Sequence, residues 1–273
     1  MDRVPIFSLR GVGYSYPGAS SSALDGVDLE VSGGEWVALV GANGSGKSTM
    51  AKICNALLIP TQGDCFVAGK NTKDESNIPA IRRKVALVFQ NPEDQIVASI
   101  VEEDVAFGPE NLGLPSSEIR RRVDGALELV GLSDMRRKGS FALSGGQKQR
   151  LALAGALALE PVALLLDEST SMLDPEGRMS FLSCLGDLKR RGLTILQITH
   201  RMEEAIQSDR VVVLDGGRTA WKGSPTEFFD GEYRKWNFEE PPAVALYREL
   251  LSRGLLPGAT VPDVASMLSA LCL

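Results

Sequence analysis

The sequence is poor in several features that would point to particular classes of protein. It has one histidine, and its four cysteines, Cys54, Cys65, Cys184 and Cys272, show no C-x-x-C spacing. We therefore expect reduced thiols in a cytosolic chain and no zinc site. The formal net charge of −6 argues against a general nucleic-acid binder, because such binding needs clustered lysine and arginine.

Long hydrophobic runs are also missing. The most apolar stretch, residues 151–166, is interrupted by Glu160 and Pro161, and neither half approaches the ~20 residues of a spanning helix. The first five residues lack the apolar segment of a signal peptide. We expect a chain that does not cross a membrane, although docking on a membrane protein stays open.

The sequence does contain a complete phosphate-loop pattern, G-x-x-x-x-G-K-[ST], between a strand expected at residues 35–40 and a helix expected at 48–58. Its glycines let the backbone approach a polyphosphate, and the N–H groups then form an anion nest. Lys47 supplies charge for the β- and γ-phosphates, and the Ser48 hydroxyl can ligate Mg²⁺. The residues expected to bind nucleotide are Gly41, Ala42, Asn43, Gly44, Ser45, Gly46, Lys47, Ser48 and Thr49.

An acidic pair, Asp167 and Glu168, follows an apolar strand expected at residues 162–166. A carboxylate at the end of a buried parallel strand emerges at the sheet edge where ligands bind. Asp167 is therefore placed to hold Mg²⁺, directly or through water. Glu168 is placed as the general base for a water that attacks the γ-phosphate.

Between these two elements lies the segment Leu143-Ser144-Gly145-Gly146-Gln147, and here the chain resembles the ATP-binding cassette (ABC) family, whose signature is LSGGQ. The turn leads into a helix expected through residue 159, so N–H groups and a hydroxyl stand at the positive end of the helix dipole. The resemblance implies that this turn binds the γ-phosphate held by an opposite subunit, so that ATP lies between two chains.

The resemblance assigns further site residues one by one. Tyr16 matches the aromatic residue that stacks on adenine, with Tyr14 as a rival. Gln90 matches the Q-loop glutamine, which contacts Mg²⁺ and links ATP to the helical subdomain. Asp174 matches the D-loop, which communicates across the dimer. His200 matches the switch histidine, which contacts the γ-phosphate and is expected to act with Lys47 and Glu168 in catalysis.

The implied fold is an ABC nucleotide-binding domain: an α/β P-loop NTPase with a parallel core sheet, an antiparallel β subdomain and an inserted helical subdomain. We expect the ATPase domain at residues 4–238, its helical subdomain at about 91–156 and a helical C-terminal extension at 239–273. Other strands are expected at 4–16, 24–31, 65–68, 85–89 and 194–199, and a hairpin at 211–221. Other helices are expected at 115–131, 179–190, 243–254 and from Pro262 onwards.

A closer resemblance, to the ATPases of energy-coupling factor (ECF) transporters, is carried by residues 88–95, 103–111 and 171–178. It implies an ATP-hydrolysing, peripheral protein at the cytoplasmic face of the cell membrane. Its expected partners are a second ABC ATPase, a transmembrane coupling subunit and a small substrate-capturing membrane protein. Such transporters import vitamins or transition-metal ions. The capture protein selects the cargo, so this chain does not reveal it, and homodimer and heterodimer both stay open.

Other functions fit parts of the sequence. An ABC ATPase of a different transporter is one alternative. A soluble ABC ATPase of DNA repair or translation would usually carry tandem cassettes, zinc cysteines or coiled coils, which are missing. A phosphate-loop kinase would not need residues 143–147, and intact Ser144, Glu168 and His200 argue against a partner subunit that does not hydrolyse ATP.

Two departures from the family and two features of undecided role remain. Ser169 stands where the family usually has alanine, and Arg201 follows the histidine where aspartate is common. The basic clusters at 120–122 and 136–138 are interpreted as solvated surface, with contact to the coupling subunit or anionic lipid as the alternative. The C-terminal helices are expected to pack on their own domain, with dimer contacts as the alternative.

Overall fold

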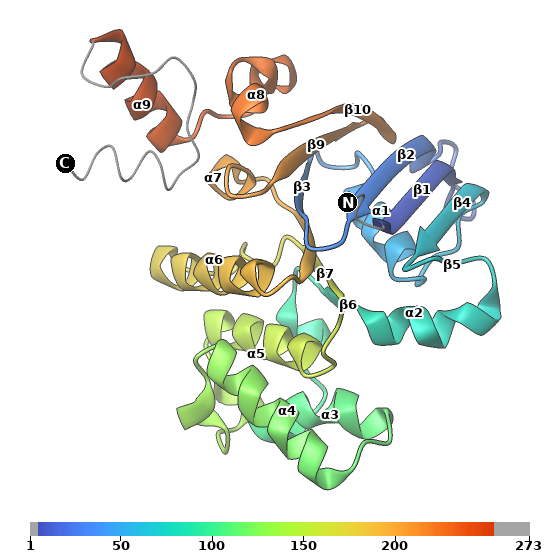
Figure 1. Cartoon of the computed structure of the whole chain (residues 1–273), viewed down its shortest axis with the longest axis vertical. Coiled ribbons are helices and arrows are strands. Elements are labelled where there is room, and N and C mark those ends of the chain that lie inside the picture. Colours follow the sequence, from blue (N-terminus) through green and yellow to red (C-terminus); the bar gives the residue numbers. More distant parts are fainter. Residues whose placement is uncertain (1–4, 254–273) are drawn as a thin grey trace.

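The computed structural model describes residues 5–253 and contains two sheets with helices around and between them (Figure 1). The larger sheet has the strand order β10-β9-β3-β8-β7-β6, in which only β10 is antiparallel to its neighbour. The smaller sheet, β2-β1-β4-β5, is antiparallel throughout. The predicted α/β fold, with a parallel core sheet beside an antiparallel layer, is confirmed.

The elements have the following bounds. The strands are β1 (Pro5–Tyr14), β2 (Leu24–Ser32), β3 (Trp36–Val40), β4 (Gln62–Val67), β5 (Lys70–Asn71), β6 (Val85–Val88), β7 (Ala163–Asp167), β8 (Thr194–Ile198), β9 (Arg210–Asp215) and β10 (Arg218–Gly223). The α-helices are α1 (Lys47–Cys54), α2 (Ile78–Lys84), α3 (Val101–Asn111), α4 (Ser116–Leu129), α5 (Gly145–Leu157), α6 (Pro175–Arg190), α7 (Met202–Ala205), α8 (Pro225–Phe229) and α9 (Pro242–Ser252). Short 3₁₀ helices are η1 (Glu75–Asn77), η2 (Pro92–Asp94), η3 (Ser133–Met135), η4 (Ser140–Ala142) and η5 (Glu232–Trp236).

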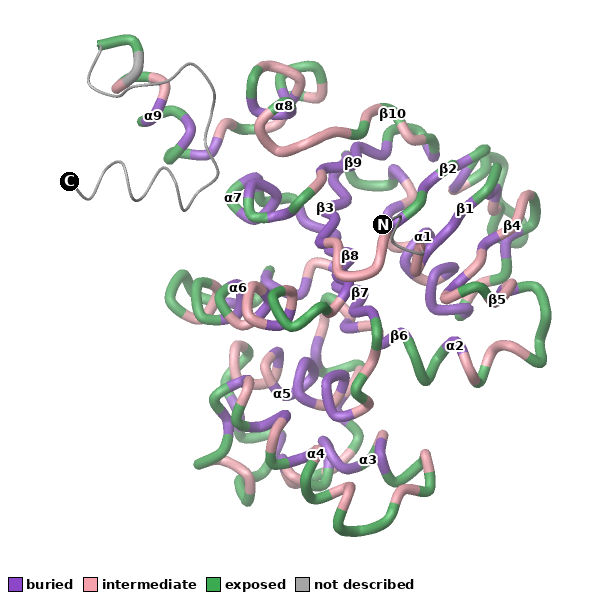
Figure 2. The backbone as a smooth tube through the Cα atoms, viewed as in Figure 1, coloured by how far each residue is buried: buried purple, intermediate pink, exposed green. Residues whose placement is uncertain are grey.

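The central strands β3, β7 and β8 are buried at every residue, as the purple tube in Figure 2 shows. Strands covered on both faces need apolar side chains on both, which explains why these segments are almost continuous hydrophobic runs. Alternate residues of β7 face different cores: Leu164 packs with the α5 side of the sheet and Leu165 with the α1 side. Helices α1 and α5 therefore lie on opposite faces of one sheet.

Helix α1 lies between the two sheets, and its Met50 and Ile53 are completely buried there. The predicted extension of this helix to residue 58 is wrong. Ala56 adopts a left-handed conformation (φ 54°), and Leu57 N donates to Lys52 O at 2.8 Å, which closes the helix end. Leu57, which lies beyond this end, is consequently 43% exposed.

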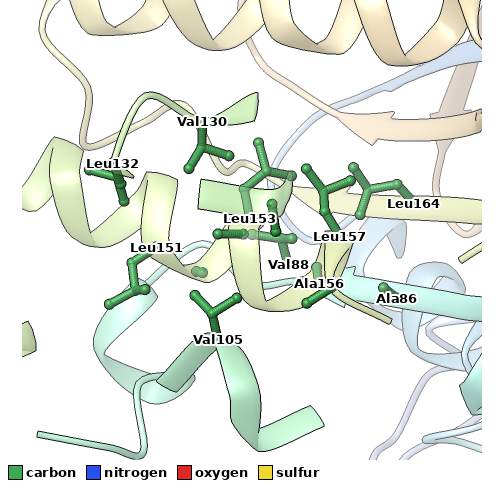
Figure 3. Close-up of a cluster of buried hydrophobic side chains, with 14 of the residues drawn as sticks. Ala86, Val88, Val105, Val130, Leu132, Leu151, Leu153, Ala156, Leu157 and Leu164 are labelled. Carbon is green, nitrogen blue, oxygen red and sulfur yellow. The ribbon is translucent and has the colours of Figure 1, made fainter. Parts of the chain in front are cut away.

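A second core joins α3, α4 and α5 to β6 and β7 (Figure 3). Its labelled side chains include Val88, Val105, Leu151, Leu153 and Leu164, all at most 1% exposed. The sequence predicts a helical section here but not the separate helix α3, because the Gly108-Pro109 pair within it resembles a helix terminator. A Cβ at Gly108 would lie 2.8 Å from Leu159 Cδ2, so this glycine permits close packing against the end of α5.

The third core attaches α9 to α8 and η5. Val244 and Tyr247 of α9 are buried among aromatic side chains that include Phe228 and Phe229. Arg248 adds hydrogen bonds to Phe229 O, the Tyr233 hydroxyl and Glu240.

The expected packing of the first C-terminal helix on its own domain is therefore confirmed. The helix expected from Pro262 lies outside the described residues, and the boundary at residues 238–239 stays a prediction. Within residues 5–253, no helix combines the length and apolar character needed to span a bilayer.

The docking of α9 can be tested with two adjacent substitutions. Val244 is fully buried and Ala245 is exposed, although both lie on the same turn of α9. We expect Val244→Asp to lower the free energy of unfolding by at least ~3 kcal/mol, because an unpaired carboxylate enters an aromatic core. Ala245→Asp is the matched control and should leave the thermal midpoint, measured by circular dichroism, nearly unchanged. Equal midpoints for the two variants would contradict the packing of α9.

Candidate active site

Several of the predicted site residues meet where parallel strands end. Gln90 follows β6, Asp167 and Glu168 close β7, and His200 follows β8. Hydrogen bonds join these loops: Ser48 Oγ donates to Asp167 Oδ1 at 3.0 Å, and Gln90 Nε2 donates to Glu168 Oε2 at 2.9 Å. Carboxyl ends of parallel strands form the ligand edge of such sheets, so the geometry agrees with the sequence prediction for this edge.

Close backbone contacts explain two glycines of the phosphate loop. Gly41 has φ 154° and Gly46 has φ 102°, both outside the range that other residues favour. A Cβ at Gly41 would lie 2.1 Å from Leu214 O, and one at Gly46 would lie 2.4 Å from Ala23 O. The loop is therefore pressed between neighbouring chain segments, whereas residues 42–44 are exposed to solvent.

Lys47 is the buried cation of this loop. Its Nζ donates to Gly41 O and Ala42 O, each at 2.8 Å, and the residue is 5% exposed. Burial lowers the pKa of Lys47, and the nearby carboxylates of Glu168 and Asp167 oppose that shift. The Lys47 ammonium group is thus held at the loop by two backbone carbonyls.

The loop fits an anionic ligand. Ser45 Oγ is buried and has no hydrogen-bond partner among the described residues. The first turn of α1 contains no acidic residue, so the helix itself adds no negative charge at the positive end of its dipole. An unsatisfied hydroxyl, a buried amine and a helix N-terminus together suit a polyphosphate.

The neighbouring oxygens fit Mg²⁺. The Ser48 hydroxyl and the Asp167 carboxylate are hydrogen-bonded to each other, and both are hard donors of the type that Mg²⁺ prefers. Burial raises the pKa of Asp167, while the Ser48 hydrogen bond opposes the shift. Residues 5–253 contain no cluster of three or more His, Cys, Asp or Glu side chains suited to a metal. Two protein oxygens beside a phosphate loop suit an ion that is shared with substrate phosphates.

Glu168 sits in an unusual backbone conformation at the centre of the site. Its φ of 49° is left-handed, which is uncommon for a residue with a Cβ. The turn directs its carboxylate between two loops: Gln90 contacts one oxygen, and His200 Nε2 contacts the other. The predicted general base and the predicted switch histidine are therefore brought into direct contact.

The signature turn lies apart from this cluster. Ser144 caps α5 in a capping box: Gln147 N donates to Ser144 Oγ at 3.3 Å, and Ser144 N donates to Gln147 Oε1 at 3.0 Å. Gly145 and Gly146 follow this cap as the first residues of α5, and Gly145 is exposed while Gly146 is half-buried. Within the described part of the chain, no hydrogen bond joins residues 144–147 to residues 41–49.

The two remaining predicted residues have local partners. Tyr16 is 41% exposed, and its hydroxyl is 3.1 Å from Thr49 Oγ1, so its ring stands beside the start of α1. Tyr14, the rival candidate, packs edge-on against Tyr16 with ring centroids 5.0 Å apart. Asp174 caps α6 by accepting a hydrogen bond from Gly177 N at 3.0 Å.

The links between the Gln90 loop and α5 have no signal in the sequence. Lys148 of α5 forms an ion pair with Glu93, and Gln149 Nε2 donates to Phe89 O at 3.3 Å. These partners are more than fifty residues apart in the chain, so no local pattern signals them. They tie the loop that carries Gln90 to the helix that begins at the signature turn.

Three of the six cations in the basic clusters form ion pairs. Arg121 and Arg122 both pair with Glu118 and Glu160. Arg136 pairs with Glu102 and Asp124. These pairs support the interpretation of a solvated surface for these three arginines, because carboxylates of the same chain neutralise their charge.

Comparison with known proteins gives consistent similarities. A family model described as ABC transporter matches residues 24–171. The chain is 49% identical to the energy-coupling factor transporter ATP-binding protein EcfA1 of Symbiobacterium thermophilum, over 98% of this chain and 97% of that protein.

Two solved structures are also similar. One is cbiO1 from Clostridium perfringens, described as part of the ABC transporter complex cbiONQ, with a TM-score of 0.78, 35% identity and coverage of 89% and 99% of the two chains. The other is the dimeric ATP-binding cassette MJ0796 in a post-hydrolysis state bound to ADP and Pi, with a TM-score of 0.74, 30% identity and coverage of 80% and 98%.

The buried carboxyl of Asp167 gives a stability test with a defined sign. Because its pKa is raised, the folded chain keeps a proton at pH values where the unfolded chain has released it, so ionised Asp167 lowers stability above that window. We expect Asp167→Asn to raise the thermal midpoint near neutral pH, by about 2–4 °C for each kcal/mol recovered.

The gain should shrink as the pH falls through the raised pKa towards the ordinary value of 3.8, and calorimetry at about pH 8 and close to pH 3.8 without nucleotide measures it. Asp215→Asn, at an exposed position, is the matched control. A lower midpoint for Asp167→Asn at neutral pH would contradict the assigned effect of burial.

Proposed function

Because the chain belongs to the ABC transporter family, and within it to the ATP-binding proteins of energy-coupling factor transporters, we propose that it powers an importer of a vitamin or a transition-metal ion. It is an ABC ATPase, and its substrate is ATP. In the proposed complex it lies at the cytoplasmic face of the membrane, beside a second ATPase, a transmembrane coupling subunit and a substrate-capturing membrane protein.

One observation carries the proposal of a two-chain site. The phosphate loop precedes α1, and the signature turn begins α5, on the opposite face of the same sheet. A single chain therefore does not bring Ser144 to a phosphate held by Lys47. A second ATPase whose signature turn faces this phosphate loop would complete the site, and its own phosphate loop would receive Ser144 in return.

The proposed chemistry is the hydrolysis of the γ-phosphate, in which positioning and charge neutralisation matter more than covalent catalysis. Glu168 accepts the proton of the attacking water, and His200 holds the carboxylate in place. Lys47 moves its ammonium group from the loop carbonyls to the β- and γ-phosphate oxygens. Ser48, Asp167 and Gln90 would hold Mg²⁺, which would supply positive charge beside the phosphates.

The remaining site residues have binding roles in this proposal. Tyr16 stacks on adenine beside α1, and the backbone N–H groups of residues 41–49 bind phosphate oxygens. Gly145, Gly146 and Gln147 present the N-terminus of α5 to the partner's nucleotide. Asp174, which fixes the start of α6, passes the state of one site to the other chain.

A groove beside Gln90 fits the coupling subunit. It has a volume of about 370 Å³ and lies between the end of α1, β6, α3 and α5. Three large apolar side chains that line it stay well exposed: Leu57 (43%), Val97 (58%) and Phe107 (49%). Apolar groups clustered in a groove are typical of a surface that another protein covers. Its connection to the Gln90 loop would let ATP binding move the bound subunit.

Replacing the proposed base tests the mechanism. We expect Glu168→Gln to reduce steady-state phosphate release by at least ~100-fold, because the amide cannot accept the proton from water. ATP binding should be preserved, and size-exclusion chromatography with ATP should show an accumulated dimer. Glu75→Gln, on the exposed helix η1, is the control. Normal turnover by Glu168→Gln would rule out this residue as the base.

Charging the groove tests the membrane partner. We expect Phe107→Asp to weaken binding to the detergent-solubilised membrane complex by about tenfold or more, because a charge replaces a central apolar contact. ATP binding by the isolated chain should be unchanged. Val162→Asp, at an exposed apolar residue outside the groove, is the control. Retention of the complex by both variants would place the coupling surface elsewhere.

A further inference from the structure

The carboxylate of Glu204, on α7, is buried and has no part in the proposed chemistry. The residue is 1% exposed, and three side chains donate hydrogen bonds to it. Thr170 Oγ1 donates to Oε1 at 2.6 Å, while Thr199 Oγ1 and Gln197 Nε2 donate to Oε2 at 2.7 and 2.8 Å. A buried carboxylate needs such partners, because an unpaired one is strongly unfavourable.

The hydroxyl donors come from the two loops that carry the proposed catalytic pair. Thr170 lies two residues after Glu168, and Thr199 directly precedes His200. Glu204 therefore joins the loop after β7 to the loop after β8 through its two oxygens. Its hydrogen bonds leave Glu168 and His200 themselves free to contact each other.

The third donor connects this bridge to the sheet. Gln197 on β8 accepts a hydrogen bond from Trp36 Nε1 at 3.0 Å with its other amide atom. Trp36 begins β3, the strand that leads to the phosphate loop. The oxygen and the NH₂ group of the Gln197 amide thus each form a hydrogen bond. These bonds fix the orientation of the amide, with its NH₂ group directed at Glu204.

Burial raises the pKa of Glu204, whereas the hydrogen bonds from Thr170 and Thr199 oppose that shift. A buried carboxyl therefore carries a desolvation penalty that an apolar side chain would avoid. An apolar side chain would, however, leave three buried donors without partners. The carboxylate is the group that satisfies donors on both loops at once.

We propose that Glu204 is a positioning residue for ATP hydrolysis: it holds the loops after β7 and β8 together so that Glu168 and His200 keep their contact. This inference rests on the roles proposed above for Glu168 and His200. It predicts that the number of hydrogen bonds at residue 204 matters, and that its negative charge does not.

Glutamine tests the distinction between hydrogen bonding and charge. In Glu204→Gln, the amide oxygen can accept from Thr199 and Gln197, and the amide NH₂ can donate to Thr170 if that hydroxyl rotates. All three contacts are then kept without a charge. Glu204→Ala loses them all, and Thr170→Val removes one hydroxyl while preserving the shape of its side chain.

The experiment measures ATP hydrolysis by the full-length chain in the membrane complex with which it purifies. We expect Thr170→Val to lower kcat about tenfold while KM for ATP stays within about twofold, because the lost contact orients the reacting groups and not the bound nucleotide. Glu204→Ala should lose more, and Glu204→Gln should stay within about threefold of the unmodified chain.

A control separates positioning from folding. Ser208 is buried close to α7, and its hydroxyl is within hydrogen-bond distance of Ala205 O (2.7 Å) and Arg210 O (3.0 Å), neither of which lies on the two loops. Ser208→Ala should lower the thermal midpoint at least as much as Thr170→Val without changing kcat. A wild-type kcat in Thr170→Val, or a kcat loss that follows only the loss of folded protein, would overturn the proposal.

Two further outcomes are decisive. A Glu204→Gln variant as inactive as Glu204→Ala would show that the negative charge is required, and this would also overturn the proposal. Glu168→Gln is measured in parallel: if that variant hydrolyses ATP normally, the proposed function of the pair fails, independently of the results at residues 170 and 204.

Discussion

The site depends on the parallel pairing of four neighbouring strands. Across the sheet, Leu39 of β3 is in register with Ile198 of β8, which is in register with Asp167 of β7, and Val88 of β6 lies beside Leu166. All four strands thus end within two residues of each other along the register. Backbone hydrogen bonds in the sheet therefore determine which loops can exchange side-chain contacts, and a slip of one residue would turn each catalytic group to the other face.

The same sheet also separates the phosphate loop from the signature turn. Its two faces carry different helices, so the phosphate loop and the signature turn have separate hydrophobic cores beneath them. The links from Lys148 and Gln149 to the Gln90 loop give the α5 side one connection to the catalytic edge. Motion of α5 relative to the sheet would therefore be transmitted to Gln90, and through Gln90 to Glu168.

Local patterns in the sequence predicted the buried strands and the motif residues at the catalytic edge. Strand β7 is a continuous apolar run, and the phosphate loop is defined by adjacent residues. The predicted end of α1 was wrong, because the helix ends before Ala56, whose left-handed conformation is not signalled by composition. The network around Glu204 was missed because its donors come from three strands or loops and meet only in the folded chain. Tertiary contacts of this kind leave no period or spacing to detect.

The capping box at Ser144 limits which residue can occupy that position. Its oxygen accepts a hydrogen bond from Gln147 N, but the hydroxyl proton is still available to a second acceptor. Aspartate and asparagine cap helices equally well. Aspartate, however, would present a negative charge to an approaching phosphate, and asparagine is bulkier than a hydroxymethyl group. The needs of α5 alone would allow several residues here, and serine is the one that would also suit another chain's nucleotide in the two-chain site proposed above.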